Sequence, residues 1–249
     1  MGKPATRELE VIGATQVTPH MRRITLGGEG LADFPEDQES AYLKLIFPGD
    51  EGGKPLMRTY TIRHQRASEI DIDFALHDDM GPASRWAVAA VPGDRILVGG
   101  PGAKKMIQPE ADWFLLAGDM TALPAISVNL AALPDDARGH VVIEIPHESD
   151  RQALVHPENI RLHWVINPTP DPTGQPLLGR VQDLPWLEGQ PAVWAACEFG
   201  SMRALRRWLK HTHELPKSHL YVSSYWKIGQ TEDGHKRAKQ QDSMAESVA

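Results

Sequence analysis

The chain has 249 residues, enough for one large domain or two small ones, and its 41% hydrophobic and 24% charged residues are typical of a folded globular protein. The single cysteine, Cys197, excludes an intramolecular disulfide and an iron–sulfur cluster held by cysteines. The net charge of −7 argues against nucleic acid as a partner, although a local basic site for an anion stays open.

The first seven residues are polar and lack the apolar core of a signal peptide. No window of the sequence has enough uncharged apolar residues for a transmembrane helix. With the lone thiol, these features predict a cytoplasmic protein without a membrane span, and a monomer is the default expectation.

The first 110 residues are typical of antiparallel β structure. Short runs rich in β-forming residues alternate with turn signals such as Gly27-Gly28 and Pro92-Gly93-Asp94. The predicted strands are Met21–Leu26, Tyr42–Phe47, Arg58–His64, Ile70–Leu76 and Arg95–Val98. One helix is predicted over Ala83–Ala90, and the spacing of the strands favours a barrel or a sandwich.

From about Ala111 the pattern changes to strands that alternate with helices. The predicted strands are Trp113–Ala117, Val141–Ile145, Leu162–Ile166, Ala192–Ala196 and Leu220–Ser223, and the predicted helices are Ala122–Leu133 and Gly200–His211. This alternation indicates a parallel α/β sheet. Asn167–Gly179 is predicted to be a loop, and a polar tail is expected after Gly229.

The predicted strand Arg58–Arg63 combines residue types that suit a ring bearing a diphosphate. Alternation places Arg58, Tyr60 and Ile62 on one face. The other face carries Thr59, Thr61 and Arg63. An arginine can bridge a diphosphate, a tyrosine can pack on a flat ring, and a threonine can hydrogen-bond a heteroatom of that ring. An edge strand with a solvated polar face is the alternative interpretation.

A second motif joins a strand end to a helix start over His77–Ala87. The free N–H groups of a first helical turn form an anion site, and Gly81 would let a phosphate approach the backbone. Ser84 adds a hydroxyl donor at this turn. Ordinary helix capping by the Gly81-Pro82 turn explains the same residues.

Three motifs, in this order, resemble the siderophore-interacting proteins, which are ferric-siderophore reductases of the ferredoxin-reductase-like superfamily. They are Arg-Thr-Tyr-Thr-Ile-Arg at 58–63, His-x(3)-Gly-Pro-Ala-Ser-x-Trp-Ala at 77–87 and Gly-Asp-x-Thr-x-Leu-Pro-Ala-Ile at 118–126. The resemblance extends from Met21 to Gly229. It implies a six-stranded antiparallel FAD-binding β-barrel over residues 1–110 and a parallel-sheet, Rossmann-like NAD(P)H-binding domain over 111–223. An aromatic and basic segment with a polar tail follows over 224–249.

The resemblance also implies which residues hold FAD. Arg58, Tyr60 and Thr61 match the strand that holds the diphosphate and the isoalloxazine, and His77 matches a residue beside the sugar–phosphate chain. The full predicted set is Arg58, Thr59, Tyr60, Thr61, His77, Gly81, Ala83, Ser84, Trp86, Thr121, Tyr225 and Trp226. No side chain is required as an acid–base catalyst.

The second part of the chain favours the fold of a nicotinamide-binding domain more than its site, because it lacks Gly-x-Gly-x-x-Gly. The candidates for NAD(P)H are Gly118, Asp119, Cys197 and Glu198, with Cys197 at a position where the family has glycine. Glu198 either assists hydride positioning or caps the following helix, and capping is favoured. Cys197 is interpreted as a buried side chain rather than a nucleophile.

Basic residues cluster on the helix predicted after Gly200. Its cations are Arg203, Arg206, Arg207 and Lys210. They suit a 2′-phosphate or an electron-donor protein, but a solvated helix face is the more common outcome for such residues.

Tyr225 and Trp226 are adjacent aromatic residues that either fill a core or, as the resemblance implies, cover the isoalloxazine. An anionic ferric siderophore beside the flavin needs cations within a few ångströms, because salt screens charges beyond about 8–10 Å. The candidates are Lys44, Arg63, Lys227 and Lys236. No protein metal site is expected, because the chelate carries its own iron.

These features predict a FAD-dependent ferric-siderophore reductase that serves iron acquisition. The expected electron donor is NADH, NADPH or reduced ferredoxin, and ferredoxin is therefore a possible protein partner. A general NAD(P)H–flavin or ferredoxin-type reductase and a siderophore-binding flavoprotein without enzymatic activity are the alternatives.

Overall fold

The computed structural model of the protein describes residues 6–49, 53–77, 80–213 and 215–248. The chain divides into two compact units. The barrel unit comprises the described residues up to Met106 together with Ser127–Asn129 and Ser149–Leu154. The sheet unit comprises Ile107–Ile126, Leu130–Glu148 and the described residues from Val155 onward.

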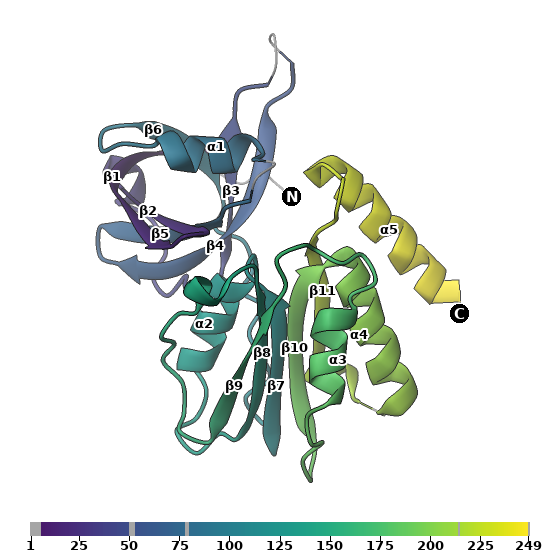
Figure 1. The fold of residues 1–249 in the computed structure, drawn as a ribbon. Coiled ribbons are helices and arrows are strands. Elements are labelled where there is room, and N and C mark those ends of the chain that lie inside the picture. The colour runs from purple at the N-terminus through teal and green to yellow at the C-terminus, as the bar shows by residue number, and fades with distance from the viewer. Residues whose placement is uncertain (1–5, 50–52, 78–79, 214, 249) are drawn as a thin grey trace. The chain divides into compact units, whose positions relative to one another are not determined.

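The barrel unit is built on a closed antiparallel barrel with the strand order β1-β2-β5-β4-β3-β6 (Figure 1). Its strands are β1 (Thr6–Thr18), β2 (Met21–Gly27), β3 (Tyr42–Phe47), β4 (Leu56–Arg66), β5 (Glu69–Ala75) and β6 (Arg95–Gly99). The six-stranded antiparallel barrel predicted from the sequence is therefore confirmed.

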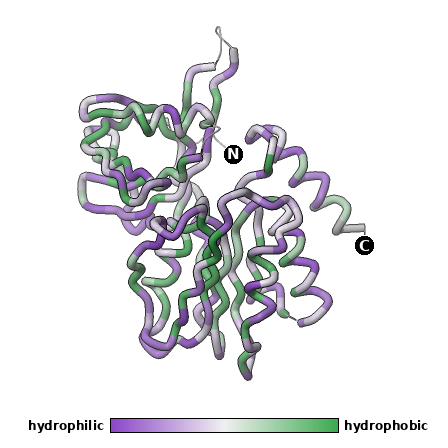
Figure 2. Tube along the Cα trace, in the orientation of Figure 1, coloured by the Kyte–Doolittle hydropathy of each residue, from purple (hydrophilic) through white to green (hydrophobic). Residues whose placement is uncertain are grey.

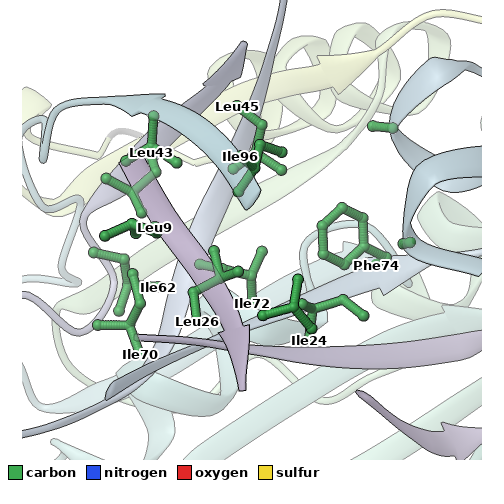
Figure 3. Packing of buried hydrophobic residues seen from close by; sticks show 14 of the residues in the cluster. Leu9, Ile24, Leu26, Leu43, Leu45, Ile62, Ile70, Ile72, Phe74 and Ile96 are labelled. Carbon is green, nitrogen blue, oxygen red and sulfur yellow. The ribbon is translucent and has the colours of Figure 1, made fainter. Parts of the chain in front are cut away.

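Aliphatic side chains fill the barrel from all six strands. Figure 3 shows them converging on the interior, and the fully or almost fully buried set includes Leu9, Ile24, Leu43, Ile62, Ile72 and Ile96. Full burial of one such side chain contributes about 1.5–3 kcal/mol. The closed barrel is therefore a well-packed frame from which β4 presents its polar residues.

The helix α1 (Pro82–Ala89) closes one side of the barrel. Its Trp86 ring packs against Phe47 and Phe74, with ring centroids 6.1 Å and 5.8 Å apart. Proline stands at the start of the helix, where its missing N–H costs nothing. This packing fixes α1 relative to β3 and β5.

The sheet unit has a five-stranded parallel sheet with the order β11-β10-β7-β8-β9. Its strands are β7 (Trp113–Asp119), β8 (Gly139–Ile145), β9 (Ile160–Ile166), β10 (Pro191–Glu198) and β11 (Leu220–Trp226). Figure 2 shows hydrophobic residues concentrated along the central strands. The predicted Rossmann-like parallel sheet is confirmed.

The helices of the sheet unit are α2 (Leu123–Ala131), α3 (Gln175–Gln182), α4 (Phe199–Thr212) and α5 (Glu232–Val248). Side chains of α3 and α4 pack on one face of the sheet, against Val193 and Cys197 among others. Figure 1 shows α2 on the other face of the sheet. Because helices cover both faces of the sheet, β7 and β10 are buried along their whole length. This burial explains why their sequences are mostly apolar without alternation.

Three elements differ from the sequence prediction. The strand β1 was not expected, because its polar residues and Gly13 interrupt the apolar alternation. The helix α3 begins at Gln175, inside the segment predicted as a loop. The predicted polar tail forms α5, a helix with little apolar periodicity that is held by polar contacts to the rest of the unit.

Polar contacts with the rest of the sheet unit are made, among others, by three side chains of α5. His235 Nε2 lies 2.8 Å from the Ser224 hydroxyl, and Lys239 Nζ donates to Ser223 Oγ at 2.7 Å. Arg206 on α4 donates to Asp242 at 2.8 Å. These contacts replace the apolar stripe that an amphipathic helix would show. No helix within the described ranges is long and apolar enough to cross a membrane.

Candidate functional site

The strand β4 presents the polar motif found in the sequence. Its ladder with β3 pairs Arg58 with Leu45 and Tyr60 with Leu43. Ile62 is fully buried in the barrel core, and the half-buried Tyr60 packs its ring on Phe74, with centroids 4.4 Å apart. The Arg58 guanidinium donates to the Met57 carbonyl at 3.0 Å. Thr59 is exposed and Thr61 is half-buried on the same strand.

The first turn of α1 lies open to a ligand. The residue before the helix, Gly81, is extended (φ −73°, ψ 177°), and no side chain caps the helix among the described residues. A Cβ placed at Gly81 would have no heavy atom of the described residues within 4 Å, so those residues leave space beside the turn. Ala83 and Ser84 are 3% and 5% exposed, whereas His77, before the helix, is exposed. The helix itself leaves the backbone N–H groups of its first turn without partners, so they can donate to a ligand.

A buried carboxylate, Asp119, organises the end of the parallel sheet. One of its oxygens accepts the Glu198 N–H and the Trp226 indole N–H, each at 2.8 Å. The other accepts from the Thr121 backbone at 2.9 Å and from the Thr121 hydroxyl. Burial raises the pKa of Asp119, and these hydrogen bonds oppose the shift. Asp119 therefore ties together the ends of β7, β10 and β11.

Glu198 caps the helix α4. Its carboxylate accepts from the backbone N–H groups of Gly200 and Ser201, which confirms the capping interpretation. The second carboxylate oxygen accepts the Ile228 N–H at 3.1 Å. Both oxygens are thus engaged within the sheet unit, and the segment after β11 is fixed to the start of α4.

Cys197 and Gly118 have packing roles. The Cys197 side chain is fully buried, and burial, reinforced by nearby carboxylates, raises the pKa of its thiol. The thiol therefore stays protonated, as the interpretation as a buried side chain required. At Gly118, an added Cβ would lie 2.5 Å from the Ala196 carbonyl oxygen and 2.9 Å from Ile126 Cδ1. Glycine is needed there because β10 and α2 approach closely.

The two adjacent aromatic residues belong to β11, which extends to Trp226 rather than ending at Ser223. Tyr225 packs edge-on against Trp194 with ring centroids 6.4 Å apart, and burial raises the pKa of its hydroxyl. Trp226 is tied to Asp119 instead. Successive strand residues point to opposite faces, so the two aromatic rings serve different surroundings.

Glu144 is a candidate residue that sequence reasoning missed. It is the next-to-last residue of β8, and its register partner on β7 is Asp119. Burial raises the pKa of Glu144 to about 7, with Asp119 adding to the shift and a hydrogen bond from Asn167 at 3.1 Å opposing it. Its second oxygen is buried and has no hydrogen-bond partner among the described residues. The signal in the sequence was a single acid near the end of an apolar strand.

A cavity of about 400 Å³ lies beside the start of α4. Three cations line it, namely Arg203, Arg207 and Lys227. Lys227 Nζ lies 4.5 Å from the centroid of the Phe199 ring, a cation–π arrangement. Arg203 also pairs with Asp242 at 3.2 Å. Of the four basic residues predicted on this helix, Arg206 is instead bound to Asp242.

The four cations predicted for a siderophore are distributed over both units. In the barrel unit, Lys44 Nζ lies 5.7 Å from the Tyr42 ring centroid, and Arg63 lines a separate cavity. In the sheet unit, Lys227 lines the cavity beside α4, and Lys236 pairs with Glu232 at 3.0 Å. Over the described part of the chain, no cluster of three or more His, Cys, Asp or Glu is suited to hold a metal ion.

The residues of the barrel unit fit FAD. The uncapped turn at Gly81 offers backbone N–H donors beside open space, which suits a pyrophosphate. On β4, the guanidinium of Arg58 and the ring of Tyr60 occupy alternate positions of one face, which suits a diphosphate next to a flat ring. The chain thus combines an antiparallel barrel whose residues fit FAD with a parallel sheet covered by helices.

Comparison with known proteins shows which family the chain belongs to. The model of the siderophore-interacting FAD-binding domain matches residues 10–55 and 49–105, and that of the siderophore-interacting protein matches residues 111–229. The chain is 33% identical to the ferric vibriobactin reductase ViuB of Vibrio cholerae, over 92% of each chain. The chain therefore belongs to the family of siderophore-interacting proteins.

Solved structures agree with this assignment. The siderophore-interacting protein SipS from Aeromonas hydrophila is 37% identical, with a TM-score of 0.86 over 97% of this chain and 99% of that one. A siderophore utilization protein from T. fusca is 32% identical, with a TM-score of 0.84 over 94% and 98% of the two chains. The ferredoxin-NADP+ reductase from Plasmodium falciparum, at 12% identity and a TM-score of 0.66, shares the fold alone.

Proposed function

We propose that this protein is a FAD-dependent ferric-siderophore reductase, which releases iron from its chelate as Fe(II). The observation that carries the proposal is the pairing of the β4 motif with the open first turn of α1 in a member of this family. The identity to a ferric vibriobactin reductase over nearly the whole chain supports the same class of reaction.

In this proposal the barrel unit holds FAD. Arg58 binds the diphosphate, Tyr60 packs on the isoalloxazine, and Thr61 hydrogen-bonds a heteroatom of the ring. The turn at Gly81 and the hydroxyl of Ser84 bind the pyrophosphate. Trp86 acts indirectly, because its packing on Phe47 and Phe74 holds the turn in place.

FAD, when bound, supplies the conversion between a donor of electron pairs and an iron that takes one electron at a time. The chain binds and orients this group and provides positive charge for the substrate. Reduction lowers the charge on the iron and therefore its attraction to the anionic oxygens of the chelate. No residue is needed as a general acid or base.

We further propose that the cavity beside α4 receives a nicotinamide dinucleotide. Arg203 and Arg207 line it, and cations of this kind bind phosphate groups well. Ligands of open parallel sheets bind outside the carboxyl ends of the strands, and Glu198 lies at that end of β10. A reduced ferredoxin is the alternative donor.

The ferric siderophore is an anion, and Lys44, Arg63, Lys227 and Lys236 are proposed to offset its charge. The expected contributions differ. Lys236 already pairs with Glu232, so it has less to offer a new anion than Lys227, which lies over an aromatic ring. Lys227 is therefore the cation we expect to matter most among those of the sheet unit.

The donor is tested on purified protein loaded with FAD under anaerobic conditions. NADH, NADPH and reduced ferredoxin are each mixed with the protein, and bleaching of the flavin absorbance is followed. We expect bleaching by a nicotinamide dinucleotide, slowed by Arg207→Gln through a higher KM. Bleaching by ferredoxin alone would overturn the assignment of the donor while leaving the flavin site intact.

A further inference from the structure

A second cavity lies in the barrel unit; it is not part of the proposed flavin site, but it includes Arg63, one of the four cations proposed for the siderophore. Its volume is about 410 Å³, which lies within the roughly 300–1,000 Å³ of small-molecule sites. Strand ends and one loop of the same unit line it. Its polar lining residues are Thr18, Arg23, Arg63, His64, Arg151 and Gln152.

The loop that closes this cavity is firmly attached to the barrel. It follows a short 3-10 turn, Glu148–Asp150, and the Asp150 side chain is fully buried. Asp150 accepts the His20 N–H at 2.9 Å and faces His20 Nδ1 at 2.7 Å. Burial opposes ionisation of Asp150, but the hydrogen bonds from His20 lower its pKa. Arg151 and Gln152 are thereby presented to the cavity by a fixed backbone.

A β-bulge directs two neighbouring basic residues to the same cavity. The register between β4 and β5 shifts between Ile62 and His64. In a regular strand, adjacent side chains point to opposite faces, and a bulge changes this locally. Arg63 and His64 consequently both line the cavity, away from the buried Ile62.

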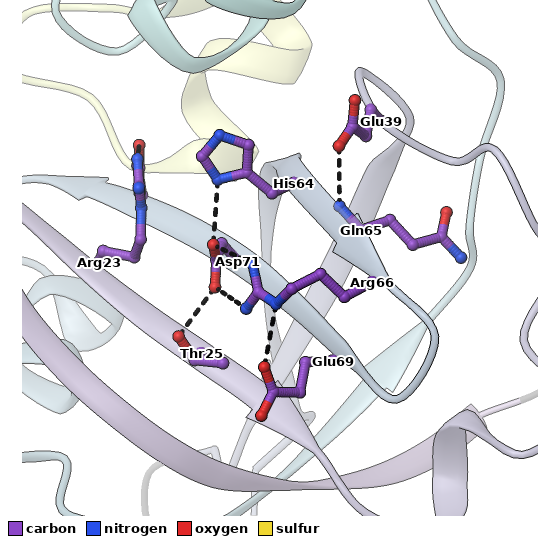
Figure 4. Close-up of polar contacts among 9 residues, drawn as sticks. Arg23, Thr25, Glu39, His64, Gln65, Arg66, Glu69 and Asp71 are labelled. Carbon is purple, nitrogen blue, oxygen red and sulfur yellow. Dashed lines mark hydrogen bonds and ion pairs between the residues drawn. The ribbon is translucent and has the colours of Figure 1, made fainter.

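Two of the basic lining residues are already paired. Arg23 makes a two-point contact with Asp73 at 2.6 Å and 2.7 Å. His64 Nδ1 lies 3.0 Å from Asp71, which also binds Thr25 and Arg66, as Figure 4 shows. Burial opposes ionisation of Asp71, but these hydrogen bonds hold its pKa well below its usual range. The carboxylates of Asp71 and Asp73 are therefore already hydrogen-bonded to other side chains.

Arg63 differs from Arg23 and His64, because it does not pair with either of these carboxylates. No hydrogen bond or ion pair joins its guanidinium to any side chain of the described residues, and no carboxylate of that part of the chain lines the cavity. Burial lowers the pKa of Arg63; Asp73 opposes that shift and Arg23 adds to it. An arginine nevertheless stays charged, so the half-buried guanidinium of Arg63 favours an anion in this cavity.

Gln152 is a second, independent indication that this cavity binds a ligand. Its Nε2 is buried and has no hydrogen-bond acceptor among the described residues. A buried donor without an acceptor costs about 1–3 kcal/mol, so such groups point to a missing partner. Gln152, whose Nε2 lacks an acceptor, and Arg63, whose guanidinium has no side-chain partner among the described residues, line the same cavity.

We propose that this cavity binds a small organic anion that bears several carboxylate or phosphate groups. Arg63 forms the charge-assisted contact and Gln152 Nε2 donates to a further anionic oxygen. Thr18 is a third polar residue at the site. The volume exceeds that of a single inorganic ion, which favours an organic polyanion. The proposal does not rest on the flavin function.

The two sources of this chemistry are separated by calorimetry on the flavin-loaded protein at matched ionic strength. Citrate represents the carboxylates, and inorganic pyrophosphate represents the phosphates. We expect saturable binding of one of the two. Arg63→Gln should weaken that binding at least tenfold, and Gln152→Glu, which brings a negative charge to the cavity, should abolish it.

The matched control is Arg95→Gln, because Arg95 is an exposed arginine of the same barrel paired with Glu8 outside this cavity. It should leave the affinity within twofold of the parent. Flavin absorbance and thermal melting verify that each variant is folded, and Arg63→Lys supplies a variant that keeps the charge, with an intermediate loss. Binding of neither anion to the parent, or equal affinity in Arg63→Gln and Arg95→Gln, would overturn the proposal.

Discussion

Polar groups are concentrated at two places in this protein, and they are left open to a ligand at one place and paired within the protein at the other. At the start of α1 in the barrel unit, Gly81 leaves the helix uncapped, and the strand β4 supplies Arg58. At the carboxyl end of the parallel sheet, Glu198 caps α4 with its own carboxylate, and Asp119 accepts four hydrogen bonds from its own unit. The first arrangement offers donors to a ligand, and the second uses them to hold the fold together.

This difference explains why the flavin motif is so much stronger than the nicotinamide motif. A phosphate binds where backbone N–H groups are left over, and the capping carboxylate of Glu198 removes two of them at α4. The donor must then rely on side-chain cations such as Arg203 and Arg207. We expect such a site to be weaker than one built from a helix terminus.

The largest effect should come from Arg58, the cation of the open site. Arg58→Ala removes a charge-assisted contact to the diphosphate worth about 1.5–3 kcal/mol, so FAD affinity should fall roughly 10- to 100-fold. The ratio of flavin absorbance to protein after gel filtration measures retention. Arg95→Ala, on the same barrel, is the control and should retain flavin. A fully flavinated Arg58→Ala would remove Arg58 from the site.

The next effect concerns Glu144, whose second carboxylate oxygen is buried without a hydrogen-bond partner in the described part of the chain. Because its folded pKa is raised to about 7, the folded state keeps a proton that the unfolded state has released. Stability should therefore fall as pH rises from the unfolded pKa near 4.5 to about 7, and stay level above it. After allowance for its partial exposure, the change is on the order of 2 kcal/mol.

Urea denaturation of the parent and Glu144→Gln at several pH values tests this prediction. The substitution should remove the loss, so the two stability curves should converge at low pH and separate towards pH 7. His163 acts in the opposite direction. Burial, together with nearby Arg180, lowers its pKa to about 4, so its contribution rises with pH between that value and 6.5. Parallel curves for parent and variant would contradict the role of Glu144.

A substitution at Gly81 should convert the open helix start into a capped one. Its extended backbone and the free space beside it accommodate aspartate, the residue type that caps helices. Gly81→Asp should raise the stability of the flavin-free protein by about 0.5–1 kcal/mol while FAD affinity falls roughly tenfold. Gly81→Ala, which neither caps nor carries charge, separates bulk from charge. A gain in both quantities would show that no phosphate binds at this turn.

The smallest of these effects should come from Lys227. Loss of one partly exposed cation near an anionic chelate is worth about 1 kcal/mol, so Lys227→Ala should raise the KM for an anionic ferric siderophore roughly fivefold. Lys227→Arg should restore most of the affinity. Lys236→Ala should change the KM less, because Lys236 is already paired. Unchanged kinetics in Lys227→Ala would exclude this residue from the chelate site.

The sequence predicted both folds, because buried strands and turn residues leave local signals. It could not predict α5, whose side chains are mostly polar and which is held by contacts such as Arg206 with Asp242. Nor could it predict the cavity around Arg63, because the register shift after Ile62 depends on the pairing of β4 with β5.

The same limit applies to Trp226. Its adjacency to Tyr225 was visible in the sequence, but its hydrogen bond to Asp119, more than a hundred residues away, depends on the order of the strands. The roles of Glu198 and Cys197 were easier to anticipate, since capping and burial follow from the residues beside them. Roles that depend on contacts between residues far apart in the sequence could therefore be found only in the structure.

The most direct test of the central claim is an anaerobic electron count. Protein with stoichiometric FAD is fully reduced and mixed with excess ferric siderophore, while an Fe(II)-specific chelator traps the product. The account predicts that flavin absorbance returns and that two Fe(II) appear for each FAD, because one electron pair serves two iron centres. A flavin that stays reduced, with no Fe(II) trapped, would contradict the assignment as a ferric-siderophore reductase.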